Sequence, residues 1–138
     1  MAQYSHLSIF NGTPYDFVRG DHHSYQMDDW DSAFPDFIKA GSKARIQIGF
    51  QNPFFGSKSD DGAEQVYILN GASSSFQILA RAPGGEFQLL LNPVNLSNDG
   101  HAHAPVNMGW REDSELYIWV AGRNDGYLVR SWWLGEEA

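Results

Sequence analysis

Short runs of alternating apolar and polar residues recur along the chain and predict β-strands. Successive side chains of a strand point to opposite faces, so each run presents one apolar face to a core. The runs cover residues 6–10, 15–19, 44–50, 65–69, 76–79, 87–91, 115–120 and 127–132. No stretch of about a dozen residues places apolar side chains at helical spacing without an intervening Gly or Pro. The pattern therefore predicts an all-β protein of about eight to ten short strands.

Turn residues between the runs predict how the strands connect. Asn11-Gly12 and Asn70-Gly71 each separate two strand-like runs, and Asn-Gly is a strong signal for a hairpin turn. Glycine-containing turns also follow residues 76–79 and 115–120. Short strands joined in this way are typical of an antiparallel β-sandwich, and we expect a single domain of this kind over residues 1–138.

The composition limits the chemistry that the chain can perform. A chain of 138 residues buries about 68–70% of its unfolded surface, which is enough for a core without disulfides. Since the chain has no cysteine, thiolate catalysis, disulfides and thiolate metal sites are excluded. The sequence also contains no hydrolase elbow, zinc-protease helix motif or phosphate-binding loop. A binding protein is therefore favoured over an enzyme.

Charge and hydropathy bear on partners and location. Nine Lys and Arg stand against seventeen Asp and Glu, a net charge of −8, which argues against binding nucleic acid. The sequence contains no run of about 18 apolar residues, so no transmembrane helix is predicted. Residues 1–10 lack the basic start and apolar stretch of a signal peptide. We expect a cytoplasmic protein, or one released by a non-classical route.

Histidines suggest a possible transition-metal site. Residues 21–31, DHHSYQMDDWD, contain two histidines and four aspartates. If this segment is a strand, Asp21 and His23 share one face and need further ligands from elsewhere. His101 and His103, separated by one residue, would share a face of a strand and supply two imidazoles to one divalent metal. A polar strand and a solvated loop are the alternatives.

Two longer stretches, residues 52–62 and 92–105, lack strand character and are predicted as loops, where binding residues commonly lie. Asp60, Asp61 and Glu64 supply carboxylates around a glycine, a composition suited to Ca²⁺ although the spacing differs from an EF-hand. No cofactor is expected unless Ca²⁺ or a divalent transition metal binds.

Aromatic residues make up 14% of the chain, including five tryptophans. Adjacent side chains of a strand face opposite ways, so one of Trp132 and Trp133 is expected to point outward. Exposed aromatic rings are typical of membrane interfaces and of surfaces that stack against sugars. The candidate membrane- or ligand-binding residues are Tyr25, Trp30, Phe54, Phe55, Trp110, Trp132 and Trp133.

The order of these signals resembles the aegerolysins and the related actinoporin-type cytolysins. The strand at residues 7–10 leads into Asn11-Gly12-Thr13, Trp30 precedes Pro35 and Gly41, and a hairpin covers residues 66–79. The resemblance covers residues 5–91. It implies a small β-sandwich that recognises sphingolipids or lipid mixtures in membranes, in some members together with a second, pore-forming protein.

We therefore expect a non-enzymatic protein that binds membrane lipid through exposed loop aromatics, as a possible homo-oligomer or with a pore-forming partner. The chain has no long amphipathic helix of the kind that solo pore-formers insert, so binding without lysis is predicted. A carbohydrate-binding lectin, which could be Ca²⁺-dependent, is the alternative. A metal-dependent β-barrel enzyme using His23, His101 and His103 is the second alternative.

Overall fold

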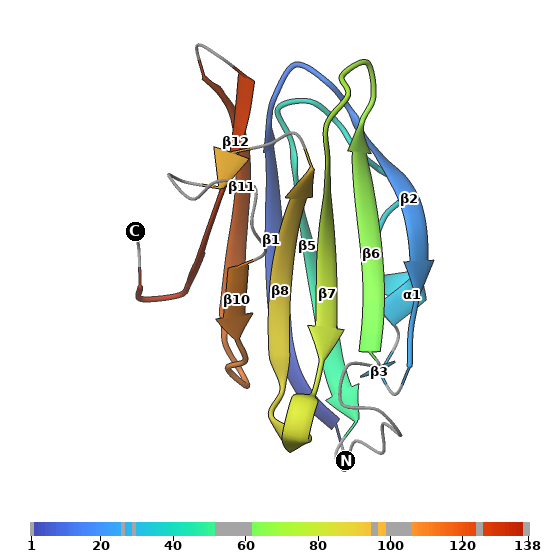
Figure 1. The fold of residues 1–138 in the computed structure, drawn as a ribbon, viewed down its shortest axis with the longest axis vertical. Helices are drawn as coiled ribbons and strands as arrows, with labels where there is room; N and C mark the ends of the chain where they lie inside the picture. The colour runs from blue at the N-terminus through green and yellow to red at the C-terminus, as the bar shows by residue number, and fades with distance from the viewer. Residues whose placement is uncertain are drawn as a thin grey trace.

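The computed structural model describes residues 2–25, 27–28, 30–51, 62–94, 97–98, 106–123 and 126–136. They form two six-stranded β-sheets that pack face to face (Figure 1). Sheet A contains, in spatial order, β3 (Met27–Asp28), β5 (Lys43–Gln51), β1 (Ala2–Gly12), β11 (Glu115–Arg123), β12 (Gly126–Trp133) and β9 (Ser97–Asn98). Sheet B contains β10 (Val106–Gly109), β8 (Gln88–Val94), β7 (Ser75–Arg81), β6 (Gly62–Leu69), β2 (Phe17–His23) and β4 (Phe37–Ile38). The predicted all-β sandwich is confirmed.

The N-terminal strand β1 lies in the interior of sheet A. It pairs antiparallel with β5 and parallel with β11, so that Leu7 lies opposite both Ile46 and Leu116. A parallel pair requires a crossover connection rather than a tight turn. Here the connection contains every strand of sheet B. The two ends of the described chain are thereby held in one sheet.

The core lies between the sheets and follows the predicted alternation. Leu7 and Ile9 of β1 are fully buried, as are Leu116 and Ile118 of β11. An aromatic cluster fills the space beneath sheet B. Its rings meet at tilted or edge-on angles, which is the favourable arrangement for aromatic pairs. The cluster comprises Phe17, Trp30, Phe34, Tyr67 and Phe76.

Polar ends of the buried rings are satisfied by backbone carbonyls. The Trp30 indole Nε1–H donates to the Glu64 carbonyl at 3.0 Å. The Tyr67 hydroxyl donates to the Pro35 carbonyl at 2.7 Å. Burying a polar group costs little when it keeps a hydrogen bond. These two bonds also fix the helical turn α1 (Trp30–Ala33) and the segment after it against β6.

The hairpin predicted at Asn11-Gly12 is wrong. Both residues belong to β1, and the chain then passes to sheet B, where β2 pairs with β6 and β4. A Cβ on Gly12 would lie 2.8 Å from the Val120 carbonyl oxygen, so this glycine permits close approach of β11 rather than a turn.

The Asn11 side chain organises this passage between the sheets. It is 1% exposed. Its Nδ2 donates to the carbonyls of Tyr15 (2.7 Å) and Ile38 (2.9 Å), and its Oδ1 accepts from the Thr13 backbone N–H (3.0 Å) and hydroxyl (2.7 Å). An asparagine that bonds the backbone two residues on is an Asx turn. This Asx turn lies where the chain passes from sheet A to sheet B.

The other predicted turns are present. β6 and β7 form an antiparallel hairpin across Asn70-Gly71, where Gly71 has φ +107°, and β11 and β12 form another. β7 joins β8 through the single 3-10 turn η1 (Pro83–Gly85). The predicted loop at 92–105 is partly wrong, because residues 92–94 extend β8 and Ser97–Asn98 forms β9. Residues 52–61, 95–96 and 99–105 lie outside the described residues.

Residues 21–29 do not form one strand. β2 ends at His23 in sheet B, whereas β3 pairs with β5 in sheet A. Arg19 pairs with Tyr67 of β6, and His22 pairs with Gln65. The chain therefore advances three positions along β2 but only two along β6, which is a β-bulge. The bulge and the change of sheet break the simple alternation. After β3 the chain passes through α1 back to sheet B, where it forms β4. Neither α1 nor η1, the helices of the described chain, is long and apolar enough to cross a bilayer.

Gly62, at the start of β6, provides a stability test of this close packing. A Cβ there would lie 1.6 Å from the Ala80 carbonyl oxygen, so Gly62→Ala must displace backbone. We expect it to lower the free energy of unfolding by more than about 2 kcal/mol, measured by urea denaturation. Gly122→Ala is the matched control, since its nearest contact is 3.5 Å from Tyr127. Equal stability of the two variants would contradict this packing.

Candidate functional site

The outer side of sheet A carries a cluster of aromatic and basic side chains. Because Leu7, Ile9, Leu116 and Ile118 point into the core, their neighbours in sequence point outward. Strand pairing then aligns these neighbours in two adjacent rows across four strands. One row is Lys43, Phe10, Trp119 and Arg130, and the other is Arg45, Ser8, Tyr117 and Trp132. We call this surface the aromatic face.

The cations of the aromatic face lie against its rings. Lys43 Nζ is 5.5 Å from the Phe10 ring centroid. Arg130 Cζ is 5.8 Å from the Trp119 ring and 5.6 Å from the Trp132 ring. These distances are within the range of cation–π attraction. Trp132 also stacks on Tyr117, with centroids 5.8 Å apart and planes at 25°. The face is therefore a preformed layer of rings with guanidinium and ammonium groups among them.

An open groove of about 350 Å³ lies beside the aromatic face. It is bordered by Tyr4, Ser5, His6, Arg45, Gln47, Asp113, Ser114, Glu115 and Leu134. His6 pairs across the sheet with both Gln47 and Glu115, one row beyond Tyr117. Ring surfaces on one side and hydrogen-bonding groups on the other thus form one continuous surface.

Glu115 links the groove to the aromatic face. Arg45 Nε donates to its Oε2 at 3.2 Å, and the Ser8 hydroxyl donates to the same oxygen. Partial burial disfavours the charged form, but the hydrogen bonds from Ser8 and Arg45 outweigh burial and hold the pKa of Glu115 below its ordinary value. The carboxylate therefore stays charged at neutral pH and holds the Arg45 guanidinium in place.

The candidate aromatic residues have different fates. Trp30 (1% exposed) and Trp133 (2% exposed) are core residues, so their expected role in contacting a ligand is corrected. Trp133 lies opposite Leu116 and points inward, with Nε1 donating to the Met108 carbonyl at 2.6 Å. Trp110 packs half-buried against the core. Trp132 faces outward, as expected for one of the pair. Phe54 and Phe55 lie outside the described residues.

The candidate metal ligands are only partly described. Asp21 and His23 are exposed at the end of β2. His23 Nε2 is 3.8 Å from Glu64 Oε1, because His23 and Glu64 are paired across β2 and β6. His101, His103, Asp60 and Asp61 lie outside the described residues. Within the described ranges, no three His, Asp or Glu side chains are grouped closely enough to hold a metal ion.

His22, Ser24 and Asp31 form a surface network at the end of β2. Asp31 accepts from His22 Nδ1 at 2.7 Å and from the Ser24 hydroxyl at 2.9 Å. The hydrogen bond from His22, helped by that from Ser24, lowers the pKa of Asp31. Both groups bond the carboxylate, so the serine is not positioned on the imidazole as a nucleophile would be. The network joins α1 to the end of β2.

Phe10, Tyr117, Trp119 and Arg130 were not among the residues selected from the sequence. The alternation of apolar and polar positions could have indicated that Phe10 and Trp119 point outward, since each follows an isoleucine that points into the core. What the sequence does not reveal is that β1 and β11 are neighbours, which places Phe10 beside Trp119.

No protein-family model, curated protein or solved structure matched the chain.

The lowered pKa of Glu115 predicts a pH-dependent contribution to stability. A carboxyl with a lower pKa in the folded state stabilises the fold above its ordinary pKa, and that contribution is lost as pH falls through the folded pKa. Glu115→Gln should therefore lower the free energy of unfolding by about 1 kcal/mol at neutral pH, and the difference from the original chain should shrink as the pH falls below the ordinary pKa of a glutamate. Urea unfolding at several pH values measures both quantities.

Glu136→Gln is the matched control, because Glu136 pairs with Arg111 and both side chains are about half-exposed. An exposed pair contributes little. If the two variants were equally stable at neutral pH, the role assigned to Glu115 would be wrong.

Proposed function

We propose that the protein binds membrane lipids through the aromatic face of sheet A, without catalysing a reaction. The observation that carries this proposal is the alignment of Phe10, Tyr117, Trp119 and Trp132 with three cations in two adjacent rows of one sheet surface. The family resemblance in residues 5–91 supports the same function. The proposal concerns binding and includes no lytic step.

The chemistry of the aromatic face matches that of a bilayer surface. Trp and Tyr rings concentrate at the level of lipid head groups, where an apolar body meets a wet boundary. Lys and Arg side chains attract lipid phosphates. With a net charge of −8, the chain as a whole is repelled by anionic membranes. A local group of cations among rings therefore favours zwitterionic head groups, whose phosphates are presented without net negative charge.

The most accessible ring of the aromatic face is Trp119, which is 37% exposed. The Arg130 guanidinium lies over the faces of the Trp119 and Trp132 rings. Because Arg130 already holds the Trp119 ring in place, the side chain loses little conformational entropy when it contacts lipid head groups. The proposal therefore rests on aromatic residues of the sheet, since the loop residues Phe54 and Phe55 lie outside the described residues.

Carbohydrate binding is a second candidate, favoured by the stacked Tyr117 and Trp132 beside the polar groove. Hydroxyl groups of a sugar would find donors and acceptors in His6, Gln47 and Asp113, which border that groove. The same variants test both functions, since a sugar and a lipid would use the same surface.

The test is co-sedimentation with vesicles of phosphatidylcholine, with and without sphingomyelin and cholesterol. We expect the original chain to pellet with at least one composition. Trp119→Ala should weaken vesicle binding about tenfold, the loss expected for one large apolar contact of 1.5–3 kcal/mol. The partition coefficient is measured by titrating vesicles.

Phe37→Ala is the matched control, since Phe37 is 61% exposed on β4 of the other sheet. Its binding should equal that of the original chain. Lipid binding at this face would be refuted if the original chain pelleted with none of the vesicle compositions. It would also be refuted if Trp119→Ala and Phe37→Ala weakened vesicle binding equally. Glycan-array binding that disappears in Trp119→Ala, without vesicle binding, would select the carbohydrate function instead.

A further inference from the structure

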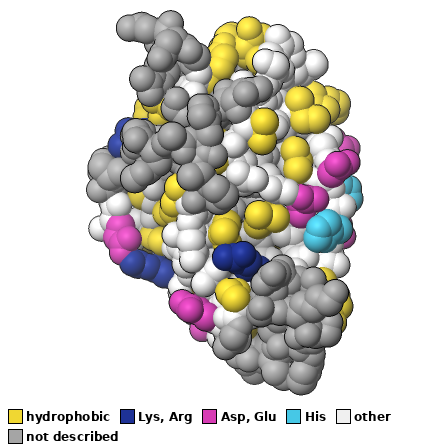
Figure 2. All heavy atoms as spheres, viewed as in Figure 1, with side chains coloured by type: hydrophobic (Ala, Val, Ile, Leu, Met, Phe, Trp, Pro, Cys, Tyr) yellow, Lys and Arg dark blue, Asp and Glu magenta, His cyan; other side chains and the backbone are white. Residues whose placement is uncertain are grey.

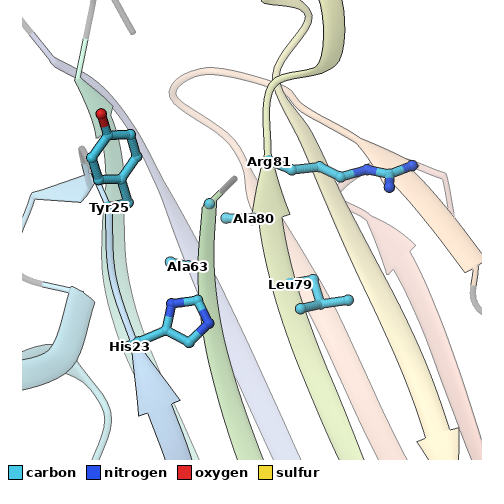
Figure 3. A pocket seen from close by; sticks show the side chains of 7 residues that line it. His23, Tyr25, Ala63, Leu79, Ala80 and Arg81 are labelled. Carbon is cyan, nitrogen blue, oxygen red and sulfur yellow. The ribbon is translucent and has the colours of Figure 1, made fainter. Parts of the chain in front are cut away.

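A hollow of about 470 Å³ lies against the start of β6 in sheet B, separate from the groove beside the aromatic face. Figure 2 shows the sheet B side of the molecule, where histidine, acidic and basic side chains are interspersed with apolar ones. The hollow is lined in part by His23, Tyr25 and Arg81 (Figure 3). The Arg81 side chain extends away from the two rings, and its Nε donates to Gln88 Oε1 at 3.2 Å. Because these side chains diverge, they are poorly placed to hold one ligand together.

The groove on sheet A instead brings together polar side chains from three segments of the chain. His6 of β1 is paired with Gln47 of β5 on one side and with Glu115 of β11 on the other. Asp113, in the turn before β11, lines the same groove. The side chains of His6, Gln47 and Asp113 make no hydrogen bond to any described residue. Polar groups that converge on one groove with unused hydrogen-bonding capacity are typical of a ligand site.

The turn that carries Asp113 is held firmly against β1. Asp113 has φ +56°, in the left-handed region that residues other than glycine seldom occupy. Its backbone N–H donates to the Tyr4 carbonyl at 2.7 Å. The Ser5 hydroxyl donates to the Arg111 carbonyl and accepts from the Ser114 backbone N–H at 3.2 Å. These bonds keep Asp113 in a strained conformation, so its carboxylate is positioned before a ligand arrives.

The charges that line the groove favour a ligand without net charge. Arg45 donates to both carboxylate oxygens of Glu115, from Nε at 3.2 Å and from a terminal nitrogen at 3.5 Å, so this cation is already neutralised. The Asp113 carboxylate would repel an anion. It can accept two hydrogen bonds from a pair of hydroxyl groups, while the Gln47 amide both donates and accepts. A quaternary ammonium group has no hydrogen to donate and would leave Gln47 and His6 unused.

We propose that the groove binds the sugar head group of a neutral glycolipid, an inference that rests on the proposed lipid binding. Glu115 borders the groove and Trp119 lies four residues along the same strand, so about 13 Å separates the groove from the Trp119 row. When the aromatic face lies on a bilayer, the groove is therefore beside the same head-group layer. Hydroxyl groups of one hexose ring bond Asp113, Gln47 and His6, while the aromatic face contacts the surrounding lipids.

The experiment measures how the full chain partitions onto vesicles of phosphatidylcholine, sphingomyelin and cholesterol, called base vesicles. The same vesicles are then prepared with glucosylceramide, galactosylceramide or the sulfated form of galactosylceramide. We expect at least one of the two neutral glycolipids to raise the partition coefficient about tenfold, the gain expected from hydroxyl groups bonded to a carboxylate. The sulfated glycolipid should give no gain, because its charge would face Asp113. A soluble methyl glycoside of the same sugar should bind far more weakly than the vesicles.

Asp113→Asn is the principal variant, since asparagine also tolerates a positive φ and the turn is preserved. It should remove most of the glycolipid gain and leave the partition onto base vesicles as it was. Gln47→Ala, at an exposed position of β5, should reduce the same gain. Glu112→Gln is the matched control, because it removes the same charge from an exposed neighbour that does not line the groove. Its partition onto every vesicle should equal that of the original chain.

Binding to base vesicles without a gain from either neutral glycolipid would overturn this inference and leave the proposed lipid binding in place. Binding to none of the vesicles would overturn both. The inference would also be wrong if the gain persisted in both Asp113→Asn and Gln47→Ala, or if the sulfated glycolipid gave an equal gain. A loss of binding to base vesicles in Asp113→Asn would assign the groove to the choline group instead. A soluble glycoside that bound as tightly as the vesicles would identify a free glycan as the ligand, against the proposal.

Discussion

The parallel pairing of β1 with β11 is the constraint on which the rest of the molecule depends. β1 is hydrogen-bonded along both edges, so sheet A cannot close until the chain has returned after building sheet B. The aromatic face is a product of that return. Phe10 and Trp119 are 109 positions apart in sequence and meet only when the two strands are paired. Contacts of such long range are formed late and slowly, so the face is a property of the completed fold.

The sequence predicts the structure best where the structure depends on neighbouring residues alone. Alternation in residues 65–69 and 76–79, with Asn70-Gly71 between them, predicts a hairpin, and the structure contains it. This hairpin is predictable because every signal that it requires lies within about fifteen residues. The same turn signal at Asn11-Gly12 was misleading. There the glycine is needed for the proximity of Val120, and the asparagine bonds Ile38. Both partners are distant in sequence, so no local reading of the dipeptide reveals them.

The candidate site was less predictable for the same reason. Alternation correctly places one of Trp132 and Trp133 outward, but it does not say which sheet face is buried or what lies beside it. The high content of aromatic rings suggests more rings than one core can bury, which wrongly makes Trp30 a surface candidate. In the structure the cluster around Tyr67 accommodates Trp30 fully. The proximity of His23 to Glu64 depends on the pairing of β2 with β6, which single-strand patterns do not encode.

The buried amide of Asn11 has a consequence for the chemical ageing of the protein. Asparagine followed by glycine is prone to lose its amide nitrogen when the next backbone nitrogen attacks the side-chain carbonyl carbon, and asparagine is among the thermolabile residues. The chain has two such pairs. The Asn11 amide is buried and held by hydrogen bonds at both its nitrogen and its oxygen, so it cannot rotate into the attacking geometry. Asn70 is exposed in a turn whose next residue is a glycine with φ +107°. On long storage the added negative charge would therefore arise in the β6–β7 hairpin, leaving the junction between the sheets intact.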